Sequence, residues 1–444
     1  MYTKIRGEWY DFATFQHPGG PIALNLTKDR DATALFESHH LLSSQSKMDT
    51  ILKKYKVKIQ NPNKNNTNSN HPDHPKKSIH SLQLLDETND DGAHYQWKDF
   101  HNDPFVKDLK LLLVDYFTPI AKARNCTLYQ AAKATPERWA LVISLFITFV
   151  ATIPFYISGQ YWALFVTPQL AWVVIANYWH DCLHFSFSSD WRINAWLPYL
   201  VPLLSSPWLW YHQHVLGHHA YTNIGYKDPD LAHAPQLLRE HSSIKWKKLH
   251  GSQGFQRMVL VWSIAVSLGL NFLNDFKTNL KSSYNNVVPY AKLKKARLIA
   301  HILGRGIYFF LMFVWPYLTF SIGKATMWVI ISNTSFSLSF MVNSQINHLT
   351  EDCTDGHDPN FLKHQVLTAQ DFGRDSWFCG LFSGHLNLQI EHHLFPFVNH
   401  CHLVHLAPKV EEICKKHGVK YHKADGYVDA FYKHFNHTKE MARL

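Results

Sequence analysis

The sequence lacks the cysteine patterns that stabilise secreted proteins or hold zinc through thiolates. Its six cysteines are scattered over 444 residues, and none belongs to a C-x-x-C pair. We therefore expect neither a disulfide framework nor a cysteine zinc site, and a reducing, cytosol-facing environment fits. The cysteines are Cys126, Cys182, Cys353, Cys379, Cys401 and Cys414.

A cleavable signal peptide is also missing. Residues Met1 to Trp9 contain no apolar run, so we expect the N-terminus to stay in the cytosol. The net charge of +10 suits nucleic acid or an anionic membrane face equally well. Because the sequence has no long basic helix and no basic stripe interleaved with aromatics, we expect no nucleic-acid partner.

Charge is absent from long stretches of the chain. No Asp, Glu, Lys or Arg occurs from Trp139 to Tyr178. The mean hydropathy of −0.22 hides this pattern, because it averages soluble and membrane parts. A bilayer core needs about 20 apolar residues per helix. We therefore predict four spanning helices in two hairpins, with turns near Ser158 and at Gly323–Lys324: 139–158, 161–180, 302–322 and 325–346.

Two further apolar stretches, 193–210 and 258–274, are short or rich in proline, so we expect them to lie in the membrane interface. Two hairpins return the chain to its starting side, which places everything outside them in the cytosol with the N-terminus. A spanning 258–274 would instead put the last histidine cluster on the opposite face from the first two.

The composition divides the chain into three parts. Residues 1–60 have the pattern of a small α+β unit. Residues 61–78 are polar and low in complexity, which is typical of a flexible linker. Residues 79–444 contain the apolar stretches and form the predicted all-α membrane domain. We find no internal repeat.

Histidine is abundant, with 31 residues, and two groups of histidines lie in the first unit. His17 opens a His-Pro-Gly-Gly turn, and His39 and His40 end the sequence Asp31-Ala-Thr-Ala-Leu-Phe-Glu-Ser-His-His. Two such histidines could ligate a haem iron from opposite faces, and the glycines would let the backbone approach the porphyrin. The same motif also occurs as an ordinary turn.

Residues 1–58 resemble a cytochrome b5 domain. The resemblance rests on Gly7-Glu-Trp-Tyr-Asp, His17-Pro-Gly-Gly, Asp31-Ala-Thr and Lys54-Tyr-Lys-Val. It implies a haem b with axial ligands at His17 and at one of His39 or His40. The spacing in desaturase-fused members of the family favours His40.

Three histidine clusters follow apolar stretches. His180 and His184 share one helix face, His214 repeats that spacing with His218 and His219, and His392 and His393 come after Gln389. With so much histidine, chance alone gives about two H-x-x-x-H pairs, so the spacing by itself is weak evidence. Their common location beside predicted spans is stronger evidence, because such residues near membrane depth are usually functional.

Seven imidazoles exceed the three or four ligands that one zinc ion needs. They suit two metals, and nitrogen-rich sites with open positions suit iron that handles oxygen. Such a pair must be reduced before it can activate oxygen. A tethered haem unit would raise the local concentration of the reductant.

The full set resembles the membrane fatty-acid desaturases, in particular the cytochrome b5-fused front-end group. The resemblance covers nearly the whole chain. It rests on the first box, on His214-x-x-x-His218-His219-Ala-Tyr-Thr-Asn with Asp228-Pro-Asp, and on Gly384-His-Leu-Asn-Leu-Gln-Ile-Glu-His-His-Leu-Phe-Pro. Gln389 marks the front-end group, where other desaturases have histidine.

The resemblance implies a di-iron site with eight histidine ligands, including His348 in Gln345-Ile-Asn-His. His385 stands where the family has glycine, so it could be a spare ligand, a hydrogen-bond donor to a ligand, or simply exposed. His212, Gln389 and Asp228 are further candidates to support the ligands. We expect His400, His402 and His405 to belong to a cytosolic C-terminal tail. The implied ligands are His180, His184, His214, His218, His219, His348, His392 and His393.

The implied activity is insertion of a cis double bond between an existing double bond and the carboxyl end of an acyl chain, with Δ5 favoured and Δ6 next. The implied partners are O2, an acyl-CoA or phospholipid substrate, membrane lipids and an NADH-dependent cytochrome b5 reductase, at the endoplasmic reticulum.

Three rival functions remain. A Δ8 sphingolipid long-chain-base desaturase has the same layout, and a di-iron lipid hydroxylase uses the same scaffold, although Gln389 favours desaturation. A membrane-anchored electron carrier would need one span and no histidine boxes.

Overall fold

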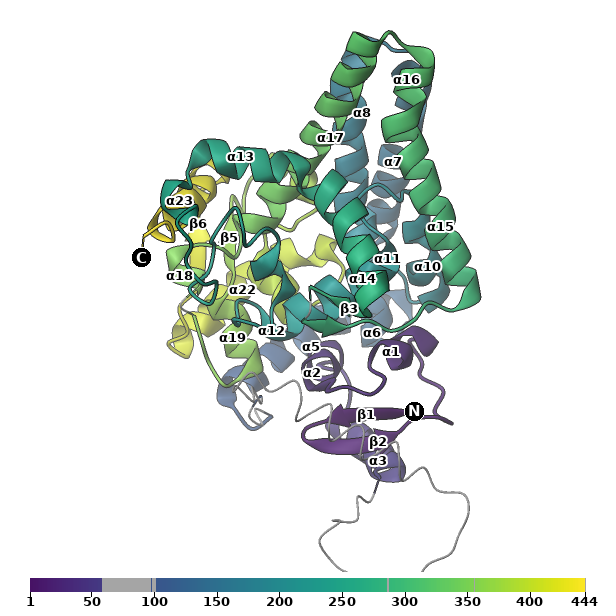
Figure 1. The fold of residues 1–444 in the computed structure, drawn as a ribbon. Helices are drawn as coiled ribbons and strands as arrows, with labels where there is room; N and C mark the ends of the chain where they lie inside the picture. The colour runs from purple at the N-terminus through teal and green to yellow at the C-terminus, as the bar shows by residue number, and fades with distance from the viewer. Residues whose placement is uncertain (58–96, 98–100, 286, 355, 444) are drawn as a thin grey trace, which may run out of the picture.

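The computed structural model describes residues 1–57, 97, 101–285, 287–354 and 356–443. A small N-terminal unit lies at one end of a mostly helical molecule, and long helices rise at the other end (Figure 1). The predicted linker, 61–78, lies outside the described residues, as do 58–60 and 79–96.

The N-terminal unit combines a hairpin with three helices, as the α+β prediction required. Strands β1 (Tyr2–Ile5) and β2 (Glu8–Asp11) pair antiparallel across a turn in which Arg6 and Gly7 both have positive φ. Helices α1 (Pro21–Leu26), α2 (Thr33–His39) and α3 (Gln45–Tyr55) follow. The unit's own core contains Ile5, Tyr10, Phe12 and Leu52.

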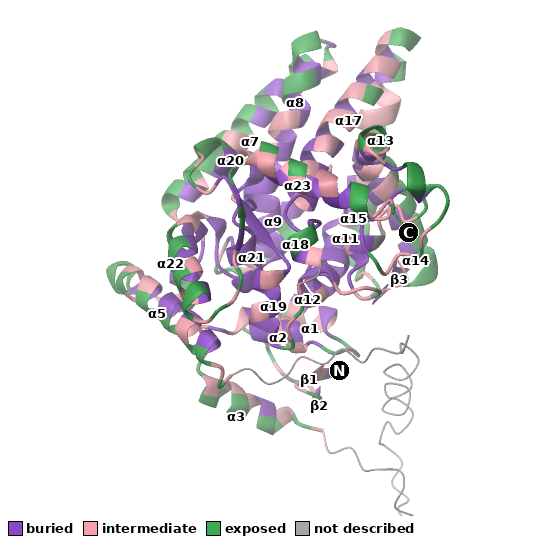
Figure 2. Cartoon of the chain, turned by 90° about the vertical axis from the view of Figure 1, so that its left-hand side faces the viewer, coloured by how far each residue is buried: buried purple, intermediate pink, exposed green. Residues whose placement is uncertain are grey.

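Four helices are long and apolar enough to cross a membrane: Leu128–Ile157, Phe255–Lys281, Lys295–Thr319 and Ile322–Gln345. Only 17% of the most apolar window of Lys295–Thr319 is buried, so its apolar side chains face outward, as lipid contact requires. The green segments at the top of Figure 2 show the same exposure.

The predicted number of spans agrees with this result, but the set differs in one member. The second predicted span, 161–180, forms α8 (Tyr161–Val174) and the π turn η1 (Ile175–Trp179), and it is not among the four. Its sequence includes Pro168, Gln169 and Asn177. The stretch 258–274, predicted to lie in the interface, belongs instead to a helix that qualifies by length and composition.

The arrangement in space nevertheless pairs α8 with the other long helices. Helices α7 (Pro136–Ile157), α8, α15 (Lys295–Phe309) with α16 (Trp315–Thr319), and α17 (Ile322–Gln345) rise together, while α13 (Phe255–Ile264) lies across their base (Figure 1). The polar Gln169 is accommodated between helices, because Ser339 of α17 donates to its side-chain oxygen at 2.8 Å.

The two hairpin turns meet at the far end of this bundle. The Lys324 ammonium donates to the carbonyl of Gly159 at 2.8 Å. The second turn lies at Phe320–Ser321, before α17 begins at Ile322, and not at Gly323–Lys324 as predicted, because the helix extends through that glycine.

Shorter elements form a cap around the base of the bundle. Contrary to the all-α prediction, the cap includes two small two-stranded sheets: β3 (Ser283–Tyr284) with β4 (Val288–Pro289), and β5 (Gln370–Phe372) parallel to β6 (His422–Ala424). The other α-helices are α5 (Pro104–Arg124), α6 (Leu128–Ala131), α9 (His180–Leu183), α10 (Trp191–Trp196), α11 (Pro207–Trp210), α12 (His219–Tyr221), α14 (Asp275–Lys281), α18 (Glu351–Thr354), α19 (Phe361–Leu367), α20 (Trp377–Ser383), α21 (Gln389–Leu394), α22 (Leu403–Lys416) and α23 (Tyr427–Glu440).

Candidate metal centre

Each histidine box lies on a short helical element of the cap. The first box is on α9, directly after the π turn η1. The second spans a longer π-helical segment, η3 (Tyr211–His218), and α12. The third is on α21. A π-helical turn precedes the first box, and a π-helical segment carries most of the second. Such turns are rare in proteins, and those that occur are often at functional sites.

The structure gathers the eight predicted metal ligands into three overlapping buried groups. The ring nitrogens of His180, His184, His214 and His392 lie within 4.8 Å of one another, and so do those of His218, His348 and His393. His219 joins His392 and His393 in a third overlapping set. Each of these side chains is less than one-tenth exposed.

The spacing of the nitrogens fits metal coordination. His180 and His214 face each other through their Nε2 atoms at 2.8 Å, and His218 and His348 do so at 3.3 Å. Two nitrogens bound about 2.1 Å from one metal lie roughly 3.0–3.4 Å apart at right or tetrahedral angles. The nitrogens of these imidazoles point at a shared centre. Metal coordination therefore explains the arrangement better than simple packing of a core does.

Hydrogen bonds on the far side of three rings determine which nitrogen remains free. The Nδ1 atom of His218 donates to Asp228 at 3.0 Å, that of His348 to the Thr368 carbonyl at 2.8 Å, and that of His393 to Gln365 at 2.7 Å. With its proton on Nδ1, each neutral ring presents an Nε2 lone pair to the cluster.

Several nitrogens in the cluster have no protein partner. Both ring nitrogens of His184 and the Nε2 of His393 are buried, and none of the three is hydrogen-bonded to a described residue. A buried polar atom without a partner is costly in free energy. Metal ions would satisfy the Nε2 of His393 and one nitrogen of His184, so the donor set fits a metal pair.

Asp228 supports the second box electrostatically, as its place among the candidates suggested. Burial lowers the pKa of His218, but the Asp228 carboxylate outweighs burial and raises it above its ordinary value. Gln389 lies at the cluster itself: its side-chain amide donates to the Nε2 of His348 at 2.9 Å, so metal ligation through that nitrogen requires this contact to change.

His212 and His385 lie outside the cluster. The ring of His212 joins the Trp208 carbonyl to the Ala291 amide, which is a structural contact. His385 has φ +67° just after α20, and its ring covers Gly380.

His400 was expected in a cytosolic tail, and the structure corrects this. It is fully buried, its Nε2 lies 3.0 Å from the Nδ1 of His392, and its own Nδ1 faces the Gly384 carbonyl at 2.8 Å and Asp181 at 2.9 Å. Because a carbonyl and a carboxylate only accept, the proton of His400 is on Nδ1. His392 therefore donates from Nδ1 and keeps its Nε2 lone pair toward His219.

Sequence reasoning missed His400, Gln365 and Thr368 as supports of the ligands. None of them belongs to a spaced motif. Only His400 gave a signal, since it follows the third box by a few residues.

The haem-ligand candidates lie in the N-terminal unit. The rings of His17 and His40 have centroids 6.0 Å apart, close to the roughly 6 Å expected for two imidazoles bound to one iron at about 2 Å. His40 donates from Nδ1 to the Phe36 carbonyl at 2.7 Å, which leaves its Nε2 lone pair available. The Gly19 amide donates to the Nδ1 of His17, so ligation by His17 through Nε2 requires this contact to change.

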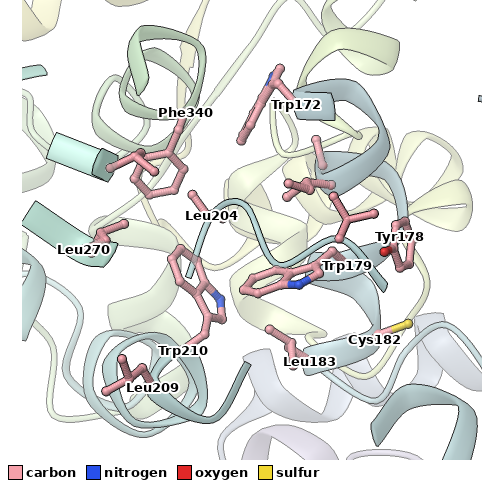
Figure 3. Close-up of a cluster of buried hydrophobic side chains, with 14 of the residues drawn as sticks. Trp172, Tyr178, Trp179, Cys182, Leu183, Leu204, Leu209, Trp210, Leu270 and Phe340 are labelled. Carbon is pink, nitrogen blue, oxygen red and sulfur yellow. The ribbon is translucent and has the colours of Figure 1, made fainter. Parts of the chain in front are cut away.

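An apolar cavity adjoins the histidine cluster. Its walls include Trp172, Leu204, Trp210 and Phe340, whose side chains lie near one another in Figure 3, and His180 lines it as well. The Trp210 ring stacks near His214, with centroids 5.0 Å apart, and near Phe340 at 5.8 Å. Polar groups border the cavity as well: Asp230, His233, Asn343, Ser344, Gln345 and Gln389.

Comparisons with known proteins agree with this geometry. The family model described as "Fatty acid desaturase" matches residues 159–425. The chain is 25% identical to "Delta(5) fatty acid desaturase A" of Dictyostelium discoideum, over 99% of this chain and 90% of that protein. It is 28% identical to "Acyl-lipid (8-3)-desaturase" of Physcomitrium patens (98% and 87%) and 24% identical to "Acyl-lipid omega-13 desaturase" of Chlamydomonas reinhardtii (98% and 92%). No solved structure matches the chain.

The family model covers more than half of the chain and includes all eight clustered histidines. Membrane-capable helices, buried imidazoles that could hold metal ions and an adjoining cavity with aromatic walls fit oxygen-dependent desaturation of a fatty acyl chain. This chain belongs to the fatty acid desaturase family and is an oxygen-dependent oxidoreductase.

Proposed function

We propose that the protein is a front-end desaturase, which inserts a cis double bond between an existing double bond and the carboxyl end of an acyl chain. Δ5 is the favoured position and Δ6 the next. The observation that carries this proposal is the place of Gln389 in the cluster, where its side-chain amide contacts the Nε2 of His348 beside a small cavity. A glutamine there is the mark of the front-end group.

Two iron ions held by the eight histidines would supply oxygen activation and the removal of two hydrogens from adjacent methylenes. The chain's residues do the rest. Trp172, Trp210 and Phe340 line the small cavity at the cluster, where they would hold the reacting methylenes and exclude water. The polar border near Asp230 and Gln345 suits the polar end of the substrate.

Electrons would arrive through a haem b bound by His17 and His40 and reduced by an NADH-dependent cytochrome b5 reductase. The ring spacing in the N-terminal unit supports this role. We place the protein in the endoplasmic reticulum, with the haem unit and the histidine boxes facing the cytosol.

Two of the relatives named above support the regiochemistry, because their names specify Δ5 and (8-3) desaturases. The (8-3) name is typical of enzymes that act on the carboxyl side of existing double bonds. The Chlamydomonas relative is named for an omega-13 position, so position has to be measured.

The test is expression in a yeast-like host that lacks polyunsaturated lipids, with C18 and C20 precursors fed separately. New double bonds are located by gas chromatography and mass spectrometry. A new bond on the carboxyl side of an existing one supports the proposal and separates Δ5 from Δ6. An unchanged acyl pool with new bonds or hydroxyls in long-chain bases would replace it with the sphingolipid or hydroxylase function. A His392→Ala variant is the inactive control.

A further inference from the structure

The N-terminal unit has two apolar surfaces, and only one of them serves its own core. Ile5, Tyr10, Phe12 and Leu52 pack inside the unit. Ile22 (2% exposed) and Leu26 (1%) instead pack with the core around the first two histidine boxes. The buried Ala34 and Leu41 belong to a second core, shared with cap helices such as α5 and α19. These four side chains are buried because the unit rests on the cap.

Close polar and steric contacts reinforce this docking face. A Cβ on Gly20 would lie 2.3 Å from the indole of Trp191, so the backbone of the unit touches that ring directly. The Arg30 guanidinium donates to the Pro289 carbonyl at 2.8 Å. The face therefore has a buried apolar centre and a polar edge, which is the organisation of a specific interface.

The unit rests on the elements that carry the second histidine box. Helix α1 packs against η3, and α2 packs against α12, so the helix that ends at His39 abuts the segment that carries His219. Figure 1 shows α1 and α2 directly beneath these cap elements.

His39 and His40 have different surroundings. His40 faces His17 within the unit. His39 is anchored by its Nδ1, 3.1 Å from the Leu35 carbonyl and 3.0 Å from the Ser38 hydroxyl, and its buried Nε2 has no partner among the described residues. His39 is the last residue of α2, and α2 packs against α12, which begins at His219, so His39 stands where the unit meets the segment that carries a predicted metal ligand.

We propose that the N-terminal unit delivers electrons from a fixed, docked position, and that His39 is the positioning residue between the haem pair and the metal cluster. This inference rests on the proposed function. Each transfer oxidises the haem iron from ferrous to ferric and reduces one iron of the pair from ferric to ferrous. The NADH-dependent reductase supplies the electrons, and two transfers reduce both irons.

The docking is tested with a site-specific protease sequence inserted into residues 61–78 of the full chain. After cleavage in mild detergent, we expect the N-terminal fragment to co-elute with the remainder in size-exclusion chromatography. Trp191→Ala should decrease the co-eluting fraction several-fold, because it removes the ring against Gly20. Trp196→Ala, on the same helix α10 and 43% exposed, is the matched control and should leave that fraction unchanged. Loss of the fragment from the unsubstituted protein overturns the proposal.

The role of His39 is tested by His39→Leu in the uncut protein. We expect an unchanged haem spectrum, an unchanged rate of haem reduction by the reductase, and a several-fold slower reoxidation of the haem by the metal centre. The exposed His405→Leu is the control. Equal reoxidation rates in both variants overturn the assignment. Absence of a haem spectrum in the unsubstituted chain would refute the proposed function instead, and the co-elution result would still report on docking.

Discussion

His400 illustrates how a single buried ring can determine the state of a metal ligand. Its proton is directed to Asp181 and Gly384, so its other nitrogen accepts from His392. Such partners of metal ligands typically change metal affinity by about 10–100-fold when they are substituted. Neither the box motif nor its spacing includes this residue.

We therefore expect His400→Leu to lower iron affinity by about 10–100-fold and activity with it. The measurement is iron content per chain after dialysis against a weak chelator, with the exposed His405→Leu as control. Full iron content and normal activity in His400→Leu would show that His392 does not need this partner.

Glu37 couples the pH to the stability of the N-terminal unit. Burial raises its pKa, but hydrogen bonds from His101 and Arg6 outweigh burial and hold the pKa below its ordinary value of 4.5. A carboxyl group of this kind stabilises the fold above its ordinary pKa. That contribution is lost as the pH falls through the lower folded pKa.

We expect α2 to lose protection against hydrogen exchange as the pH falls below 4.5, after correction for the intrinsic exchange rate. Glu37→Gln should remove this dependence and destabilise the unit by about 1–2 kcal/mol at neutral pH. Glu8→Gln, in a more exposed ion pair with Lys56, is the comparison. An identical pH profile in Glu37→Gln would assign the dependence to another group.

At the scale of elements, the approach of α20 to the first box depends on one glycine. Gly384 ends α20 in the left-handed region at φ +67°, and a Cβ there would lie 2.1 Å from the Ala176 carbonyl of η1. Gly418 has the same φ of +67°, but a Cβ there would meet nothing within 4 Å. Comparing substitutions at Gly384 and Gly418 therefore separates the cost of backbone strain from the cost of a steric clash.

Gly418→Ala should cost about 1–2 kcal/mol through its left-handed backbone alone. Gly384→Ala adds a clash with backbone, which cannot move away as a flexible side chain could. We expect it to destabilise the protein by several kcal/mol, of the order of other severe core substitutions. Thermal unfolding in detergent measures both, and equal losses would mean that η1 and α20 can separate at little cost.

At the scale of the whole molecule, the metal cluster restricts the membrane topology. His218 and His348 face each other at 3.3 Å, so the chain between them starts and ends at one side of the bilayer. We expect Lys295–Thr319 and Ile322–Gln345 to form a hairpin that crosses and returns. A third crossing by Phe255–Lys281 would separate the two histidines. We therefore expect this helix to stay at one face, despite its composition.

Cysteine labelling tests this topology. Cysteines at the exposed positions Gln256 and Lys281 should react with an impermeant reagent from the same side as one at Lys47. A cysteine at the exposed Ser158, in the far turn of the first hairpin, should react only from the opposite side. The unsubstituted chain gives the background of the native cysteines. Opposite labelling at positions 256 and 281 would mean that the helix spans.

The sequence by itself determined the parts of this protein that depend on local pattern. Uncharged runs such as Trp139–Tyr178 require lipid or a buried core, and three of the four predicted spans are helices that qualify for a membrane. The box histidines were identifiable because their clusters lie directly beside the apolar stretches.

Only the tertiary structure decided which groups from distant segments complete the site. His400, Gln365 and Thr368 contact the ligands because separate cap elements fold against one another, and no short-range pattern encodes such a contact. Composition alone also does not decide whether α8 and Phe255–Lys281 cross the membrane. The polar groups of α8 find partners on α17, and the outward apolar face of the other helix does not require it to cross. Burial and hydrogen bonding are properties of the packed molecule, and they determine these features.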